Sequence, residues 1–135
     1  MIKGFRYLSA DVIWAIASMG HGDEIAIVDA NYPAYSMSKD TRYLNLHGES
    51  VYNVVSEILN YIPLDSSVEK PIIFMKPKTG LENEQNKLIE KLRINQTYFL
   101  LERHKFYERS KECFSIIATS SKEPFLNIII KKGTL

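Results

Sequence analysis

The sequence has little cysteine and almost no excess of charge of either sign. Its single cysteine, Cys113, excludes an intramolecular disulfide and is typical of a protein from a reducing compartment. Seventeen Lys and Arg residues against sixteen Asp and Glu residues leave a net charge of +1, which provides no general attraction to nucleic acid or to an anionic membrane. No apolar run approaches the length of a transmembrane helix, and the first residues lack the apolar stretch of a signal peptide. We therefore expect a cytoplasmic protein that acts on neither nucleic acid nor membrane.

Motifs of three common classes of site are also missing. The three histidines lack the spacing of metal ligands, and no cysteine pair assists them, so no metal site is expected. Gly20-His21-Gly22 is a lone Gly-x-Gly that precedes an apolar run, whereas a nucleotide-binding glycine loop follows one. A serine or cysteine nucleophile in its strand-to-helix turn is absent as well. What remains is acid, base and hydrogen-bonding chemistry.

The residues that are present predict an ordinary globular chain, since 135 residues with 45% hydrophobic content suffice for a buried core. Apolar residues spaced three and four apart, with their flanking signals, predict helices at residues 10–19, from 49 or 50 to 62, at 83–93 and near Phe106. Short apolar runs predict strands at residues 25–28, 42–46, 71–75, 97–101, 114–118 and 128–130, with turn and loop at 31–39. Because helices and strands alternate, we predict a single α/β domain over residues 1–135, a three-layer α/β/α fold with a mixed sheet.

Polar side chains stand at both ends of the first predicted strand. His21 precedes residues 25–28 and Asp29 follows them, and ligand-handling groups at strand ends are the usual way in which an α/β domain builds a site. A purely structural interpretation is also open. His21 suits a loop that ends a helix, and Asp29 suits a turn before Pro33.

A second group of polar side chains follows later strands. Arg103 comes directly after the strand predicted at 97–101, where a guanidinium can bind a ligand hydroxyl or carboxylate, and Asn127 precedes the last strand. The alternative for the region of Arg103 is a surface helix stabilised by ion pairs, in which Lys105 and Arg109, four residues apart, are balanced by Glu102, Glu108 and Glu112. A histidine, an aspartate, an arginine and an asparagine near strand ends are suited to proton transfer on a polar, uncharged, hydroxyl-rich substrate.

Short blocks along almost the whole chain resemble, in order, the family of the L-fucose mutarotases and D-ribose pyranases. The blocks are Gly20-His21-Gly22-Asp23-Glu24-Ile25, Asp29-Ala30-Asn31-Tyr32-Pro33-Ala34, Ser36-Met37, Phe106-Tyr107-Glu108-Arg109 and Asn127-Ile128-Ile129-Ile130-Lys131-Lys132-Gly133. The resemblance implies an isomerase that interconverts the α and β anomers of a reducing sugar by ring opening and closure, without a cofactor.

The resemblance also implies roles for individual residues and an assembly. His21 would be the proton donor, and Asp29 and Asn127 would bind the substrate. Arg103 falls where fucose-type members carry arginine and ribose-type members carry histidine, so the implied substrate is L-fucose. Members of the family form homo-oligomeric decamers whose sites are completed by a neighbouring subunit. The alternatives are a mutarotase for another aldose, of ribose or galactose type, and a non-catalytic sugar-binding protein.

The chain departs from the family pattern beside Asn127. Family members carry tyrosine and then a small residue before the asparagine, whereas this chain has Phe125 and Leu126. Both are expected to contact the sugar, but a phenyl ring has no hydroxyl with which to bind or relay a proton. Tyr32 and Tyr107 are the candidates to replace that hydroxyl.

Overall fold

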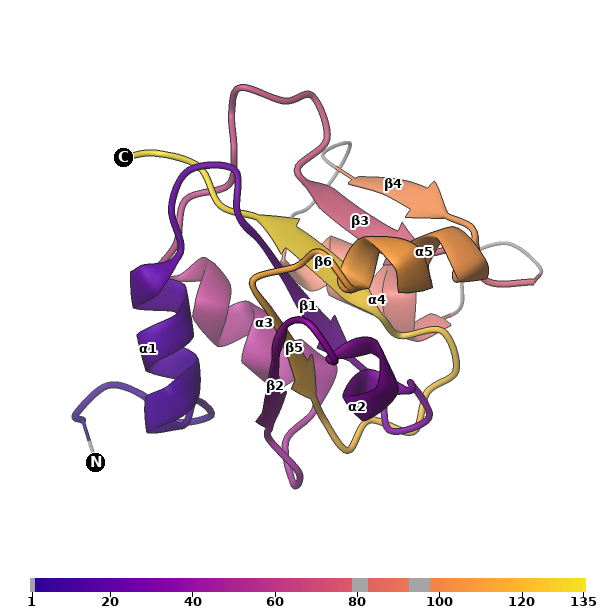
Figure 1. Cartoon of the computed structure of the whole chain (residues 1–135), viewed down its shortest axis with the longest axis horizontal. Coiled ribbons are helices and arrows are strands. Elements are labelled where there is room, and N and C mark those ends of the chain that lie inside the picture. Colours follow the sequence, from indigo (N-terminus) through magenta and orange to yellow (C-terminus); the bar gives the residue numbers. More distant parts are fainter. Residues whose placement is uncertain (1, 79–82, 93–97) are drawn as a thin grey trace.

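A computed structural model of the chain describes residues 2–78, 83–92 and 98–135, whose helices and strands alternate (Figure 1). The helices are α1 (Ala10–Ser18), α2 (Ala34–Met37), α3 (Val51–Leu59), α4 (Asn83–Lys91) and α5 (Arg103–Ser110). The strands are β1 (Glu24–Val28), β2 (Arg42–Asn45), β3 (Ile72–Met75), β4 (Tyr98–Leu101), β5 (Ser115–Ala118) and β6 (Ile128–Lys131). All the predicted strands form; the predicted terminal residues 93 and 97 lie outside the described residues.

The strands make one mixed sheet in the order β2-β5-β1-β6-β3-β4. β1 runs parallel to β5 and antiparallel to β6, and β3 runs antiparallel to β6 and parallel to β4. The register pairs Ile27 of β1 and Phe74 of β3 with Ile128, the first residue of β6. The carboxyl ends of β1 and β3 therefore flank the start of β6, and this edge of the sheet holds the candidate site.

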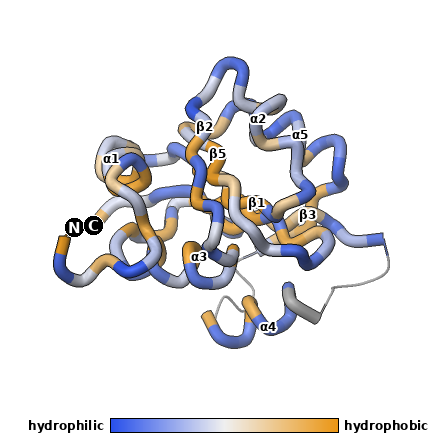
Figure 2. Tube along the Cα trace, turned by 90° about the horizontal axis from the view of Figure 1, so that it is seen from below, coloured by the Kyte–Doolittle hydropathy of each residue, from blue (hydrophilic) through white to orange (hydrophobic). Residues whose placement is uncertain are grey.

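Helices cover both faces of the sheet because successive strand residues point to opposite sides. Ile25 and Ile27 pack in the core that α1, α3 and α4 close, whereas Ala26 and Val28 pack in the core that α2 and α5 close. Figure 2 shows the hydrophobic strands between α2 and α5 on one side and α3 and α4 on the other. The prediction of a three-layer α/β/α fold with a mixed sheet is confirmed. No helix in the described part of the chain is long and apolar enough to cross a membrane.

Local signals account for the helix starts better than for the helix ends. Ser9 and Ser50 cap α1 and α3, each hydroxyl accepting a hydrogen bond from an amide three residues on. The loop prediction at 31–39 misses α2, because Pro33 occupies the N-cap of that short helix and offers no capping side chain. Helix α3 ends at Leu59, before the predicted residue 62.

The end of α1 depends on a side chain far away in the sequence. The Lys132 ammonium donates hydrogen bonds to the carbonyls of Ile16, at 3.0 Å, and Met19, at 2.7 Å. A cation at a helix C-terminus satisfies carbonyls that lack an intrahelical partner and interacts well with the helix dipole. Lys132 therefore connects the end of α1 to the end of β6.

Candidate functional site

A cavity of about 220 Å³ opens where β1 and β3 end and β6 begins. Its walls come from the segment after β1, the end of β3, helix α5 and the segment before β6: Asp29, Asn31, Tyr32, Met75, Arg103, Tyr107, Pro124, Phe125 and Asn127. The volume is below the roughly 300–1,000 Å³ of sites for drug-sized ligands, so the cavity suits a small molecule. It brings together six residues singled out from the sequence: the expected site residues Asp29, Arg103, Phe125 and Asn127, and the two candidate hydroxyl donors Tyr32 and Tyr107.

Asp29 and Asn127 form the buried polar floor of the cavity, with 4% and 3% of their surfaces exposed. The Asn127 side-chain oxygen accepts a hydrogen bond of 2.8 Å from the Asp29 backbone amide, and the Asp29 carboxylate accepts one of 3.0 Å from the Asn31 amide. Burial raises the pKa of the Asp29 carboxyl, against the opposing effect of backbone amides and Asn127. A buried carboxylate and amide that face a cavity are suited to binding sugar hydroxyls.

Helix α5 supplies the positive and aromatic side of the cavity. Arg103 is the first residue of α5, and Glu102 before it caps the helix by accepting from the amides of His104 and Lys105. One turn later, Tyr107 also lines the cavity. The helix thus contributes an exposed arginine to the same cavity as the buried Asp29.

The two tyrosines considered as hydroxyl donors differ in their surroundings. Tyr32 is buried and donates a hydrogen bond of 2.6 Å to the Ser110 hydroxyl, and burial raises the pKa of its phenol well above the usual value. Its ring packs edge-on against Tyr107, with centroids 5.2 Å apart. Because the Tyr32 hydroxyl is engaged with Ser110, Tyr107 is the better candidate for a hydroxyl that reaches a ligand.

Phe125, which lines the cavity, has an unusual backbone conformation. Its φ of 60° lies in the left-handed region, where a residue with a side chain is strained, and it is the only non-glycine residue with a positive φ in the described segments. Gln85 of α4 is fully buried and donates hydrogen bonds to the carbonyls of Phe125, at 2.8 Å, and Met75, at 3.0 Å. The Asn127 backbone amide donates a hydrogen bond of 2.9 Å to the same Phe125 carbonyl. Such strain persists where the surrounding structure fixes it, often at ligand sites.

Leu126 does not line the cavity. Its side chain is buried in the core that α1, α3 and α4 close, on the other face of the sheet from the Phe125 ring. The Leu126 backbone amide is nevertheless among the groups that lower the pKa of the Asp29 carboxyl. Any contribution of Leu126 to binding therefore comes through its backbone and through the packing behind the site.

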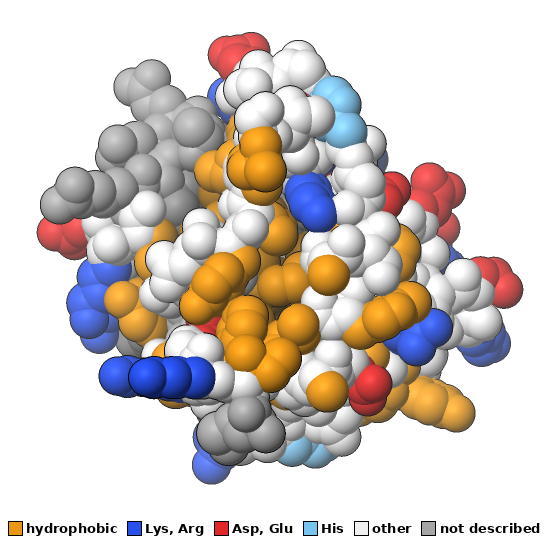
Figure 3. Space-filling view, turned by 90° about the vertical axis from the view of Figure 1, so that its left-hand side faces the viewer, with side chains coloured by type: hydrophobic (Ala, Val, Ile, Leu, Met, Phe, Trp, Pro, Cys, Tyr) orange, Lys and Arg blue, Asp and Glu red, His pale blue; other side chains and the backbone are white. Residues whose placement is uncertain are grey.

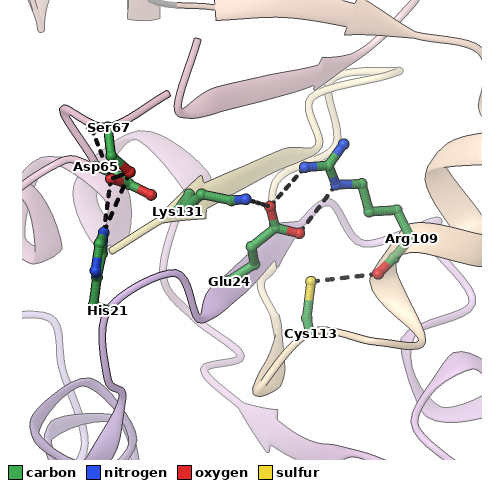
Figure 4. A network of polar contacts seen from close by, with 7 residues as sticks. All are labelled: His21, Glu24, Asp65, Ser67, Arg109, Cys113 and Lys131. Atoms are coloured by element: carbon green, nitrogen blue, oxygen red, sulfur yellow. Dashed lines mark hydrogen bonds and ion pairs between the residues drawn. The ribbon is translucent and has the colours of Figure 1, made fainter. Parts of the chain in front are cut away.

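His21 lies at the opposite end of β1 from the cavity. At about 3.3 Å per residue, β1 alone separates the two by about 15 Å. The His21 side chain is 49% exposed, and its Nε2 lies 3.0 Å from Oδ1 of Asp65 and 3.4 Å from the Ser67 hydroxyl. Figure 4 shows the ring pointing at these two residues. Within one copy, the structure does not bring His21 together with Asp29.

A larger hollow of about 500 Å³ lies near the start of β1, and its lining is mostly charged, with Asp23, Glu24, Glu108 and Glu112 beside Arg109 and Lys131. Arg109 makes two hydrogen bonds to the Glu24 carboxylate, at 3.0 and 2.7 Å, and Lys131 lies 3.6 Å from it (Figure 4). Arg109 therefore pairs with Glu24 of β1, which differs from the expected pairing with glutamates near its own helix, while Arg103 lines the cavity. Within the described residues, no group of three His, Cys, Asp or Glu side chains is placed to hold a metal ion.

Sequence reasoning missed the supporting residues of the cavity. Met75 and Gln85 are contributed by segments without any motif, and they become relevant only through the fold. Asn31 carried a usable signal, because Asp-x-Asn directly after a strand is typical of a turn in which the aspartate accepts from the amide two residues on.

Comparisons with known proteins agree with this fold over nearly the whole chain. Residues 3–135 match the RbsD / FucU transport protein family. The fucose mutarotase of Mus musculus is 36% identical over 145 residues, covering 99% of this chain and 95% of that protein. The L-fucose mutarotase of Haemophilus influenzae strain PittGG is 32% identical, with 98% of this chain and 96% of that protein covered. A crystal structure of the fucose mutarotase of Streptococcus pneumoniae in complex with L-fucose is 33% identical, with a TM-score of 0.91 and 99% of both chains covered. The chain therefore belongs to the RbsD / FucU transport protein family.

Proposed function

We propose that this chain is a mutarotase of the L-fucose type, one domain over residues 1–135 that interconverts the anomers of a reducing sugar. The observation that carries the proposal is the cavity in which a buried carboxylate, a buried amide, a guanidinium and a phenyl ring converge. Relatives named fucose mutarotase and a relative crystallised with L-fucose support the substrate class.

The reaction requires only proton transfers and a reversible change at the anomeric carbon. The anomeric hydroxyl loses its proton, the bond from the anomeric carbon to the ring oxygen breaks, and the ring oxygen gains a proton. Rotation about the adjacent carbon–carbon bond exposes the other face of the carbonyl, and ring closure reverses both transfers. Asp29 and Asn127 hold sugar hydroxyls, and Arg103 supplies further hydrogen-bond donors. The Phe125 ring packs against an apolar face of the sugar, and Leu126 supports Asp29 from behind.

His21 is the proton donor in this proposal, and a second copy of the chain brings it to the cavity. The separation of about 15 Å along β1 supports this arrangement, because His21 of the same copy lies at the wrong end of the strand. The exposed imidazole is accessible to the surface of a neighbouring copy.

Figure 3 shows hydrophobic side chains gathered on the face that carries α1 and both chain ends, and Ile2, Trp14 and Tyr61 are 46–57% exposed. Apolar surface of this kind favours a homo-oligomer, and we propose a decamer. Cys113 fits a reducing compartment, and we propose the cytoplasm.

Mixing two inactive variants tests whether sites are shared between copies. His21→Ala and Asp29→Asn should each abolish anomer exchange, one by removing the proton donor and the other by weakening sugar binding. When the two are unfolded and refolded together in equal amounts, about a quarter of shared sites combine an intact histidine with an intact aspartate. Activity should then recover to about that fraction. No recovery, in mixed oligomers verified by mass, would show that each site belongs to one copy.

Saturation-transfer NMR on equilibrated L-fucose, D-ribose and D-galactose tests the reaction and its substrate. We expect the protein to accelerate exchange between the anomers of L-fucose most strongly. Binding without acceleration of any of the three sugars would instead support a non-catalytic sugar-binding protein. Phe125→Tyr should leave the L-fucose rate equal or higher, because it supplies the hydroxyl found at this position in the family. A clear loss would mean that the cavity is built around the phenyl ring.

A further inference from the structure

We propose that Asp65 and Ser67 are positioning residues that hold His21 with Nε2 as hydrogen-bond donor, so that Nδ1 is the nitrogen that exchanges protons with the sugar. This inference rests on the proposed function, in which His21 is the proton donor. It assigns a role to the loop between α3 and β3, which lies outside the cavity around Asp29.

The hydrogen bonds around Asp65 determine which atoms of Ser67 and His21 act as donors. The Asp65 carboxylate is 4% exposed, and its Oδ1 accepts from the Ser67 hydroxyl at 2.6 Å and from the Ser67 amide at 3.0 Å. Because the Ser67 hydroxyl hydrogen points to Asp65, the Ser67 oxygen turns a lone pair toward His21. Nε2 of His21 therefore faces two acceptors, a carboxylate oxygen at 3.0 Å and a hydroxyl oxygen at 3.4 Å.

A ring nitrogen that faces two acceptors keeps its hydrogen in the neutral imidazole as well as in the cation. The other nitrogen, Nδ1, then carries the lone pair and gains or loses the proton. The Ser67 hydrogen bond, together with His21, lowers the pKa of the Asp65 carboxyl to about 2, so Asp65 is a carboxylate at neutral pH. With about half of its surface exposed, the imidazole remains accessible to a sugar in a neighbouring copy.

Backbone hydrogen bonds fix the two loops that carry His21 and Asp65, one between α1 and β1 and the other between α3 and β3. The end of β6 lies between them: the Gly22 amide donates to the Lys132 carbonyl at 2.8 Å, and the Asp65 amide donates to the Lys131 carbonyl at 3.1 Å. At Gly133, whose amide donates to the Pro63 carbonyl, a β-carbon would overlap the Leu64 carbonyl, so glycine permits this close approach. His21 and Asp65, 44 residues apart, are thereby held on one rigid support.

Nitrogen-15 NMR of the imidazole tests the assignment directly in the wild-type protein, at a pH where His21 is neutral. His21→Ala identifies its signals. We expect the Nε2–H tautomer to dominate; a dominant Nδ1–H tautomer would overturn the proposal. The measurement does not depend on turnover, so it remains decisive even if no sugar is found to exchange, a result that would count against the proposed function alone.

Variants test whether this hold on His21 matters for the reaction. Asp65→Ala should lower kcat about tenfold to a hundredfold, the loss that follows when the hydrogen-bond partner that orients a metal-binding histidine is removed. KM should change little, because the sugar is bound by Asp29 and Asn127. Asp65→Asn, which retains an acceptor oxygen, should keep the Nε2–H tautomer and recover part of kcat.

Ser67→Ala provides a second test in case Asp65→Ala does not fold. It should lower kcat by a smaller factor than Asp65→Ala does. Glu69→Gln and Ser66→Ala change exposed side chains of the same loop and serve as matched controls with wild-type kcat. A folded Asp65→Ala protein with wild-type kcat and tautomer would refute a positioning role. If the wild-type protein exchanges no sugar, the proposed function fails first and the kcat comparison no longer applies.

Discussion

The strained backbone at Phe125 allows the geometry of the cavity to be tested by stability alone. At a φ of 60°, a residue with a β-carbon costs about 1–2 kcal/mol more than glycine. Phe125→Gly and Phe125→Ala both remove the half-buried ring, a loss of about 1–2 kcal/mol that is common to the two. They differ only in the β-carbon, so their comparison isolates the strain.

The expected difference follows from two opposing effects. Removing the β-carbon relieves about 1–2 kcal/mol in the folded state. Glycine also gives the unfolded chain more conformational entropy, which costs about 0.4–1 kcal/mol of stability. Phe125→Gly should therefore be more stable than Phe125→Ala by roughly 0.5–1 kcal/mol, the reverse of the usual order of these two substitutions.

Urea unfolding at one fixed protein concentration measures the difference, since the stability of an oligomer depends on concentration. The same pair of substitutions at Lys122 is the control, because this exposed residue of the same loop does not have a positive φ. There the alanine variant should be the more stable one. If Phe125→Ala were as stable as Phe125→Gly or more so, with equal m-values, the left-handed conformation of Phe125 would be refuted.

Three further predictions concern other parts of the molecule. Arg103→His should lower the exchange rate of L-fucose relative to that of D-ribose, because histidine is what ribose-type members carry there; an unchanged ratio in saturation-transfer NMR would exclude Arg103 from sugar selection. Lys132→Met should cost about 1–3 kcal/mol in urea unfolding, because it removes two charge-assisted hydrogen bonds from the end of α1, while Lys122→Met should change little. The pKa of the Asp65 carboxyl, about 2, lies below its unfolded value of 3.8, so the unfolded chain binds more protons between these values. The stabilisation from Asp65 should be complete above about pH 4 and lost as the pH falls through about 2, and Asp65→Asn should show a shallower acid slope in thermal unfolding.

Most of the fold is readable from the sequence because its signals are local. The apolar stripe of α3 and the branched residues of β1 and β6 predict their elements directly, and Ser9 and Ser50 mark helix starts. The failures have physical reasons. Helix α2 was missed because it has four residues and no capping side chain, and α3 ends at Leu59, three residues before the predicted end. The end of α1 was predicted to within one residue, but the hydrogen bonds from Lys132, more than a hundred residues away, are visible only in the structure.

The candidate site follows the same division. Polar residues at strand ends meet where those strands are neighbours, and Asp29 and Asn127 meet because β1 and β6 are adjacent. Arg103 follows β4, two strands away from β6, and lines the cavity as the first residue of α5. The separation of His21 from Asp29 follows from the strand predicted between them, whereas which end of β1 carries the cavity appears only in three dimensions. Leu126 illustrates a simpler limit: next to Phe125 in sequence, it turns its side chain to the other face of the sheet.

Gln85 and Asp65 depend on contacts that no local pattern encodes. Gln85 donates hydrogen bonds to the carbonyls of Met75 and Phe125, which lie 10 and 40 residues away in the sequence. Asp65 reaches His21 only because the end of β6 fastens both loops. Long-range hydrogen bonds of this kind determine how precisely a site is built, and they require coordinates.

The rate of exchange between α- and β-L-fucose, with and without the protein, tests the central claim most directly. Saturation-transfer NMR should show exchange that grows in proportion to wild-type protein and is lost in His21→Ala and in Asp29→Asn, while both variants keep the wild-type fold by circular dichroism. Exchange at the uncatalysed rate in the presence of folded wild-type protein that binds L-fucose would contradict it.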